Sequence, residues 1–324
     1  MANVDRRRTL STLKSTVTFL LPASFIIVSI LLYTFRSVET GPLVGVLSRR
    51  SDAPTVTDVT AWHVSIMQSV HTSQTRAVYF SVSDSSYSKR FNELLKVSSA
   101  HFAPVPLVMS ALDTYTYEYF ARAGVPVIFV DQGTVFEGVE YTKLNLVLGL
   151  LQLGLSVYFS EMDVYWQCLP QLDYSKDFIA SQHKYAPHGE INIGFFFARP
   201  VPNVVLMFSN LATWSEKLHN RLQTSSCNGV DQKVIDLSVR GSESNNAFID
   251  EEVKSCHLSP DEIELLTRTS VDWGYLSHDI LEHWPIENIQ TVCGVHVWSG
   301  SGSSEEQFQW IQKNFLKNET KLRV

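Results

Sequence analysis

The sequence predicts an α/β fold in which a mainly parallel mixed sheet is flanked by helices, behind one N-terminal transmembrane helix. Three observations lead to this prediction. The 324 residues are 44% hydrophobic and 18% charged, as expected of a chain with a large packed core. Short runs rich in Val, Ile, Phe and Tyr alternate with segments of helical periodicity, which is the pattern of parallel α/β sheets. An uncharged stretch near the N-terminus is long enough to cross a bilayer.

The uncharged stretch runs from Ser15 to Phe35, and its 21 residues would rise about 30 Å as a helix. Four basic residues precede it, namely Arg6, Arg7, Arg8 and Lys14. The positive-inside bias then places residues 1–14 in the cytoplasm and the rest in the lumen, a single-pass type II protein that we expect in the Golgi membrane. A cleaved signal peptide is the alternative, but Ser37-Val38-Glu39 is a poor cleavage site. A buried core helix is a further alternative, which we consider weaker because no polar face interrupts the run beyond scattered Ser and Thr.

Charge and cysteine content constrain the partners and the compartment. The net charge is -7, and since residues 1–35 carry +3, the remainder carries -10, the wrong sign for a nucleic-acid-binding protein. All four cysteines follow the anchor, where disulfides can form, so we expect at least two of them to be bonded. They are Cys168, Cys227, Cys256 and Cys293. Zinc binding is the alternative, although no C-x-x-C pair exists. Asn318-Glu319-Thr320 is an N-glycosylation sequon.

The elements follow in order along the chain. Residues 36–74 are expected to form a stem with a helix around Trp62 to Val70, and residues 75–324 the folded domain. The first half is predicted to contain strands at Arg76–Val82, Val105–Met109, Val125–Val130 and Leu155–Phe159, and a helix at Tyr141–Leu153 that stops at Gly154. The second half is predicted to contain strands at Phe178–Gln182, Ile193–Ala198 and Val292–Trp298, and helices at Asn203–Leu218, Asp231–Val239 and Ser303–Phe315.

An acidic pair, Glu161 and Asp163, directly follows the strand Leu155–Phe159. The carboxyl end of a strand is where open α/β sheets bind ligands. If the backbone stays extended, both carboxylates point to one side, close enough to serve one hard divalent cation and a diphosphate. A bare acid-x-acid tripeptide is otherwise usually a solvated turn.

Five motifs in and around this pair follow one another along the chain: Lys143, the run from Gly154 to Trp166, the run from Asn192 to Arg199, Asp231-Gln232, and His296. Together they resemble the motif set of nucleotide-diphospho-sugar transferases of glycosyltransferase family 77. The similarity covers about residues 75–315. The family usually has D-x-D, whereas this chain has Glu161 in the first position.

This resemblance implies a GT-A (Rossmann-like) fold, a Mn²⁺ (or Mg²⁺) cofactor, a UDP-sugar or similar donor, and retention of the anomeric configuration. It also implies a glycan or glycoprotein acceptor. Asp163 and His296 would be metal ligands, and Glu161 a metal or ribose contact. Without the resemblance, a lone strand histidine is more often a structural residue.

The remaining motif residues would bind the donor or act in catalysis, and each also has an ordinary structural explanation. Asp231 and Gln232 would face the anomeric carbon, although Asp231 could simply be a first-turn helix acid. Lys143 would pair with the phosphates, although a helix lysine is usually solvated. Asn192 would reach a sugar hydroxyl and Gly194 would permit close approach. Ser299 and Gly300 would offer backbone N–H groups to phosphate oxygens, or form a plain flexible loop.

Two other functions compete with a transferase. A nucleotidyltransferase would ordinarily carry a Gly-rich phosphate loop, and no G-x-x-x-x-G-K-[ST] occurs. A catalytically silent lumenal protein that binds sugar nucleotides or acts as a scaffold stays open because of Glu161.

Overall fold

The computed structural model describes residues 59–130, 135–182, 191–218, 230–240, 258–283, 291–297 and 304–316. The predicted anchor, the cytoplasmic tail, Cys227, Cys256, the sequon, Ser299 and Gly300 lie outside these ranges. Among the helices within them, none combines the length and the apolar character needed to cross a membrane.

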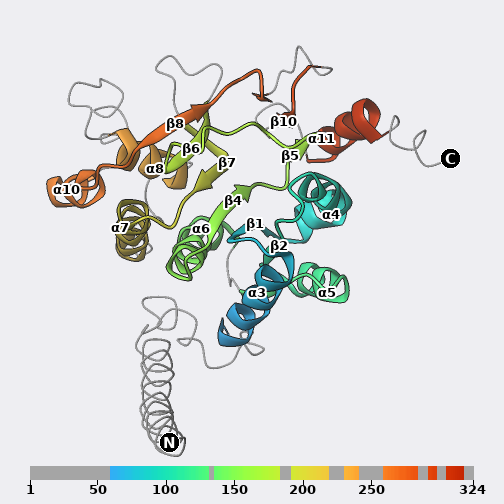
Figure 1. Cartoon of the computed structure of the whole chain (residues 1–324), viewed down its shortest axis with the longest axis horizontal. Coiled ribbons are helices and arrows are strands. Elements are labelled where there is room, and N and C mark those ends of the chain that lie inside the picture. Colours follow the sequence, from blue (N-terminus) through green and yellow to red (C-terminus); the bar gives the residue numbers. More distant parts are fainter. Residues whose placement is uncertain are drawn as a thin grey trace, which may run out of the picture. The chain divides into compact units, whose positions relative to one another are not determined.

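A seven-stranded sheet with the order β3-β2-β1-β4-β7-β6-β8 forms the centre of the domain (Figure 1). Its strands are β1 (Ala77–Ser83), β2 (Leu107–Ala111), β3 (Val127–Phe129), β4 (Ser156–Ser160), β6 (Phe178–Gln182), β7 (Ile191–Ala198) and β8 (Trp273–Leu276). The pairs β1/β2, β2/β3, β1/β4 and β6/β8 are parallel, while β7 runs antiparallel to both β4 and β6. The predicted mainly parallel, mixed sheet is therefore confirmed.

Helices cover both faces of this sheet, in agreement with the prediction. They are α3 (Val59–Ser73), α4 (Ser85–Ala100), α5 (Thr114–Arg122), α6 (Val135–Gln152), α7 (Pro202–Leu218), α8 (Val230–Arg240), α10 (Pro260–Thr267) and α11 (Ser304–Ile311), which continues as the π-helix η3 (Gln312–Leu316). The helix α6 begins before the predicted Tyr141 and ends at Gln152, one residue before the predicted end; Gly154, just after it, takes a φ of +76° and its N–H donates to the carbonyl of Leu151.

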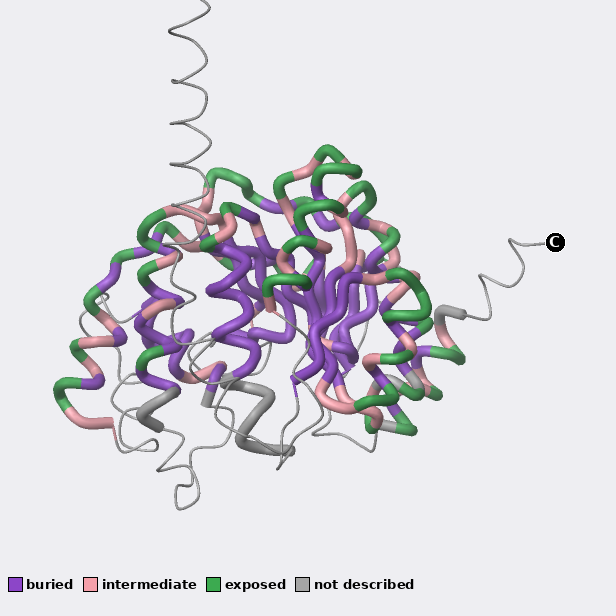
Figure 2. Tube along the Cα trace, turned by 90° about the horizontal axis from the view of Figure 1, so that it is seen from below, coloured by how far each residue is buried: buried purple, intermediate pink, exposed green. Residues whose placement is uncertain are grey.

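Aromatic side chains in register fill the two sides of the sheet. Phe80, Phe159 and Phe196 lie in one row across β1, β4 and β7, all buried, and Phe159 stacks on Phe196 with ring centroids 4.9 Å apart. On the opposite side, Tyr79 and Tyr158 pack against Phe102, which follows α4. Figure 2 shows the strands as the most continuously buried part of the described chain. The Phe run of β7 is thus core, as its composition suggests.

The helix predicted within the stem is present and belongs to the folded domain. Trp62, Ile66 and Val70 are buried on one side of α3, and the ring centroids of Trp62 and of Phe80 in β1 lie 6.5 Å apart. Burying these three apolar side chains would stabilise the packed helix by a few kcal/mol.

A second, three-stranded sheet was not predicted. It has the order β5-β10-β9 and consists of β5 (Val164–Trp166), β9 (Leu281–His283) and β10 (Gly294–His296). The strand expected at Val292–Trp298 is therefore shorter than predicted and does not join the main sheet. The disulfide Cys168–Cys293 links the ends of β5 and β10, which confirms that two of the cysteines are bonded.

Candidate active site

The acidic pair lies at the carboxyl end of β4, beside the beginning of β7. Because β4 and β7 are antiparallel, Ser160 pairs with Phe195, and the next N–H, that of Glu161, donates to the carbonyl of Gly194 at 2.7 Å. Strand pairing therefore brings the acidic pair next to Asn192 and Gly194, which the resemblance assigns to the same site.

The backbone of the pair does not stay extended, which corrects the expectation from the tripeptide alone. Residues 162 and 163 form a turn, and the N–H of Val164 donates to the carbonyl of Glu161 at 3.2 Å. The turn lets the chain leave β4 and enter β5 in the second sheet, so Asp163 lies at the junction of the two sheets.

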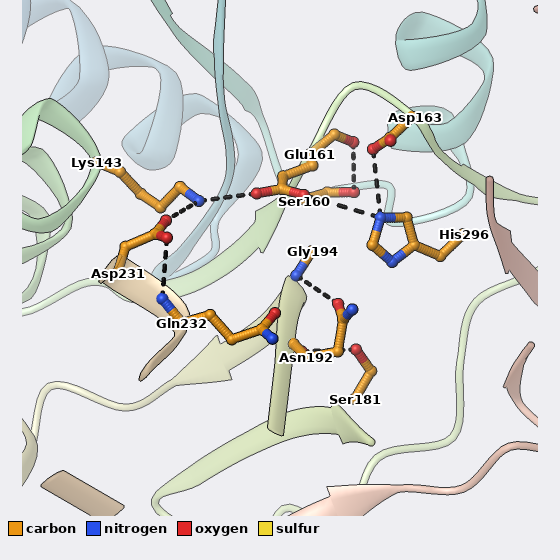
Figure 3. Close-up of polar contacts among 10 residues, drawn as sticks. All are labelled: Lys143, Ser160, Glu161, Asp163, Ser181, Asn192, Gly194, Asp231, Gln232 and His296. Atoms are coloured by element: carbon orange, nitrogen blue, oxygen red, sulfur yellow. Dashed lines mark hydrogen bonds and ion pairs between the residues drawn. The ribbon is translucent and has the colours of Figure 1, made fainter. Parts of the chain in front are cut away.

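Three potential ligands converge at this junction (Figure 3). Nε2 of His296 lies 3.5 Å from an oxygen of Asp163 and 3.8 Å from an oxygen of Glu161. One ligand atom from each of the three residues lies within 4.8 Å of the other two. The small sheet explains the approach of His296, because His296 pairs with Val164, the residue after Asp163.

The imidazole of His296 is 2% exposed and sits against a glycine. A Cβ atom at Gly194 would lie only 2.3 Å from Cε1 of His296, so a side chain there would displace the ring. The sequence suggested that Gly194 permits close approach of a ligand; in the structure the close approach is that of His296. Burial alone would lower the pKa of His296, but the charges of Asp163 and Glu161 outweigh it and raise the pKa.

Lys143 of α6 lies on the other side of Glu161. Its Nζ donates to Oε1 of Glu161 at 2.8 Å and to Oδ2 of Asp231 at 2.6 Å, and lies 4.9 Å from the centre of the Phe159 ring. Burial alone would lower the pKa of Lys143, but Asp231 and Glu161 outweigh it and raise the pKa. Lys143 is therefore a buried cation that joins the acidic pair to α8.

Asp231 and Gln232 open α8, as predicted. Asp231 is buried and its Oδ1 accepts the N–H of Gln232 at 2.9 Å, whereas Gln232 is half-buried and its side chain extends toward the part of the site that holds Asn192 (Figure 3). The Asn192 Oδ1 accepts the N–H of Gly194 at 2.9 Å, and the Asn192 carbonyl accepts the hydroxyl of Ser181 at 2.7 Å.

The pairing of β6 with β7 shifts register between Ala180 and Ser181, next to the hydrogen bonds of Asn192. A register shift of this kind is a β-bulge, and β-bulges often change the direction of side chains beside functional sites. Here the shift lies where β7 runs past the acidic pair, so Asn192 and Gly194 belong to an irregular part of the strand.

Two residues near the acidic pair, Tyr87 and His283, have no sequence signal that would have revealed them. Tyr87 lies in the first turn of α4. Burial, with a further contribution from the negative charges of Asp163 and Glu161, raises the pKa of Tyr87 to about 12. The second is His283 of β9, whose ring lies 5.0 Å from that of His296.

The chain is similar to known proteins over its folded domain. Residues 105–284 match the nucleotide-diphospho-sugar transferase family. No curated protein sequence matches the chain. Among solved structures, the chain is similar to the glycosyltransferase GlyE of Streptococcus pneumoniae TIGR4, with 11% identity and a TM-score of 0.40 over 72% of this chain and 60% of GlyE. The chain thus spans less than two thirds of the length of GlyE.

Two further structures have comparable scores. A complex of the galactosyltransferase LgtC with donor and acceptor sugar analogues shows 11% identity and a TM-score of 0.37, covering 73% of this chain and 96% of LgtC. A glycosyltransferase that acts in glycosylation of the major capsid of PBCV-1 shows 10% identity and a TM-score of 0.35, covering 72% of this chain and 99% of that protein.

Proposed function

We propose that the chain, which belongs to the nucleotide-diphospho-sugar transferase family, is a glycosyltransferase with a finer function that its site supports. The protein transfers a sugar from a UDP-sugar to a glycan or glycoprotein acceptor with retention of configuration, on a GT-A fold, and depends on Mn²⁺ (or Mg²⁺). The observation that carries this proposal is the convergence of Glu161, Asp163 and His296 at the carboxyl end of β4.

The ligand set fits a divalent cation. Two carboxylates and one imidazole supply oxygen and nitrogen atoms of the kind that Mn²⁺ accepts. Lys143 contributes one positive charge and Glu161, Asp163 and Asp231 contribute three negative charges, a net charge of -2 when His296 is neutral. When bound, the cation would neutralise charge that develops on the departing diphosphate.

The residues around Lys143 hold the donor side of the site in place. The hydrogen bond from Lys143 holds the Asp231 carboxylate at the start of α8. The next residue, Gln232, is half-buried, and its side chain is proposed to contact the donor sugar. An ammonium group has three N–H donors, and two point at carboxylates, so the third is available for a donor phosphate oxygen. Asn192 and Gly194 complete this side, and Ser299 and Gly300 remain proposed phosphate contacts.

Retention is proposed to occur by front-face substitution. The acceptor hydroxyl oxygen forms the bond to the anomeric carbon, the bond to the UDP oxygen breaks, and the hydroxyl proton passes to the departing diphosphate. Both oxygens of Asp231 accept hydrogen bonds, one from Nζ of Lys143 and one from the backbone N–H of Gln232, and these contacts fix the orientation of the carboxylate.

The proposal includes a type II location in the Golgi membrane. The disulfide Cys168–Cys293 supports an oxidising compartment. Protease treatment of sealed microsomes tests it: the residues after the anchor should survive without detergent and be digested with it. Digestion of the domain in intact microsomes would show the opposite topology.

Titration of UDP into the full chain, followed by calorimetry, tests the main proposal. Binding is expected with Mn²⁺ and is expected to be weak or absent in EDTA. A donor-hydrolysis screen over UDP-sugars then identifies the sugar. Failure to bind UDP under either condition would refute the proposed donor class.

A further inference from the structure

His283 faces the side of His296 that does not face the carboxylates. The strands β9 and β10 pair in parallel, and His283 is in register with His296, so their side chains project from neighbouring strands side by side. The two Nδ1 atoms are 3.2 Å apart, a hydrogen-bond distance, and the side chains are 3% and 2% exposed. The contact is thus built by the register of the small sheet.

The two ring nitrogens of His296 have different surroundings. Nε2 faces Asp163 and Glu161, while the other nitrogen points away from them in Figure 3. A neutral imidazole carries one proton, and the nitrogen that binds a cation must be the one without it. For Nε2 to be a ligand, the proton must therefore sit on Nδ1, where the available acceptor is Nδ1 of His283.

We propose that His283 is a positioning residue that selects the ligating tautomer of His296. Its Nδ1 accepts the Nδ1–H of His296, which leaves Nε2 of His296 with a lone pair directed at the site of the cation. The opposite arrangement, with the proton on Nδ1 of His283, would place a proton on Nε2 of His296 and prevent ligation. This inference rests on the metal dependence in the proposed function.

Hydrogen bonds to ligating histidines are a general means of fixing their tautomer and ring orientation, and their loss typically costs 10–100-fold in metal affinity. The acceptor is usually a carboxylate, a carbonyl or water; here the structure provides an imidazole. Gly194 restrains the same ring from another direction, so His296 is held by a contact on its ring atoms and by a directed bond at Nδ1.

The test compares two replacements of His283 in the full chain, with Mn²⁺ alone as the probe. His283→Leu keeps bulk and removes the acceptor, and we expect its dissociation constant for Mn²⁺ to rise on the order of 10–100-fold. His283→Asn keeps an acceptor oxygen near the position of Nδ1, and we expect its affinity to stay within a few-fold of that of the original protein. His63→Leu, on the distant helix α3, serves as the control histidine and should leave the affinity unchanged.

The affinities are measured by electron paramagnetic resonance of free Mn²⁺, and circular dichroism without metal checks the fold of each variant. An unchanged affinity of His283→Leu would overturn the inference, as would an equal loss in His283→Asn. If the unsubstituted protein itself did not bind Mn²⁺, the metal dependence in the proposed function would fail, an outcome distinct from a failure confined to His283.

A measurement on the unsubstituted protein does not depend on any variant folding. Long-range ¹H–¹⁵N correlation spectra of the histidine-labelled chain with Mg²⁺ should show His296 protonated at Nδ1 and His283 protonated at Nε2. The reverse pair of tautomers would refute the proposal.

Discussion

Glu161 lies between two halves of one acidic cluster, one with Lys143 and Asp231 and one with Asp163 and His296. The two halves differ in how closely their charged groups pair. On the Lys143 side, the nitrogen–oxygen distances are 2.6 and 2.8 Å, and one buried cation pairs with both carboxylates. On the His296 side, the distances are 3.5 and 3.8 Å, longer than a good hydrogen bond. The Lys143 half therefore holds close ion pairs, whereas the more loosely spaced His296 half is the one at which we propose that a further cation binds.

The largest effect is expected from Asp163→Asn, which acts on the His296 half. The change keeps size but removes a charge that holds a hard cation, so Mn²⁺ affinity and Mn²⁺-dependent transfer should fall by about 100-fold or more. The fold should persist, because the backbone carbonyl of Asp163 still accepts the N–H of Val297 at 3.1 Å.

Transfer assays and Mn²⁺ titration measure this effect, with circular dichroism as the check on folding. Full Mn²⁺-dependent transfer by a folded Asp163→Asn protein would mean that the His296 half is only a solvated turn.

Lys143→Met acts on the half that holds the close ion pairs, and it should lower stability as well as remove the proposed contact with the donor phosphate. It leaves Asp231, with a side chain 9% exposed, without its cation. Breaking such a pair costs about 3 kcal/mol in unfolding free energy, the lower end of the usual range because Glu161 is 36% exposed. Urea denaturation measures the change.

The matched control is Lys176→Met, because Lys176 pairs with Asp272 at 2.7 Å but the two side chains are 34% and 55% exposed. Loss of this surface pair should change the unfolding free energy much less than loss of the buried pair. Equal losses in the two variants would contradict the distinction between the buried Lys143 half and an ordinary surface pair.

Gly194→Ala should disturb the His296 half without removing a ligand. The new methyl group would meet Cε1 of His296 at 2.3 Å, so the ring must move and Mn²⁺ affinity should fall by about 10-fold, as for loss of a supporting contact. Gly274→Ala is the control, since its methyl group would meet only the flexible side chain of Lys176 at 3.3 Å. Wild-type Mn²⁺ affinity in Gly194→Ala would show that His296 does not need its present position.

Glu161→Asp should produce the smallest effects, divided between both halves. A side chain shorter by one methylene cannot keep both the Lys143 contact and the approach to His296, so one of the two should weaken. We expect a few-fold loss of Mn²⁺ affinity or a loss of about 1 kcal/mol in stability, measured by the same titration and denaturation experiments. A loss as large as that of Asp163→Asn would make Glu161 the main ligand.

Much of the main sheet could be predicted because its signals are local. The strand Phe178–Gln182 has the predicted bounds, and the predicted stop of α6 at Gly154 is explained by a positive φ. The acidic pair and His296 could be placed in one site through the resemblance, and the structure brings them together.

The small sheet and the partners within the site could not be predicted, because they depend on contacts between distant parts of the chain. The strands β5, β9 and β10 have three residues each, too few for a periodic pattern, and form only by pairing with one another. His283 is a single histidine with no neighbouring motif, so only the strand register reveals its contact with His296. Likewise, Lys143 gives no sequence sign that it is buried between two carboxylates.

The disulfide Cys168–Cys293 has a consequence for proteolysis. It spans 125 positions, so β6, β7, α7, α8 and β8 all lie within one covalent ring. Asp163 precedes this ring and His296 follows it, so any cut inside the ring places these two residues on different peptides that stay bonded through sulfur. A nicked molecule would migrate as one species on a non-reducing gel and as two after reduction, and Asp163 and His296 would stay tethered until a reductant separated them.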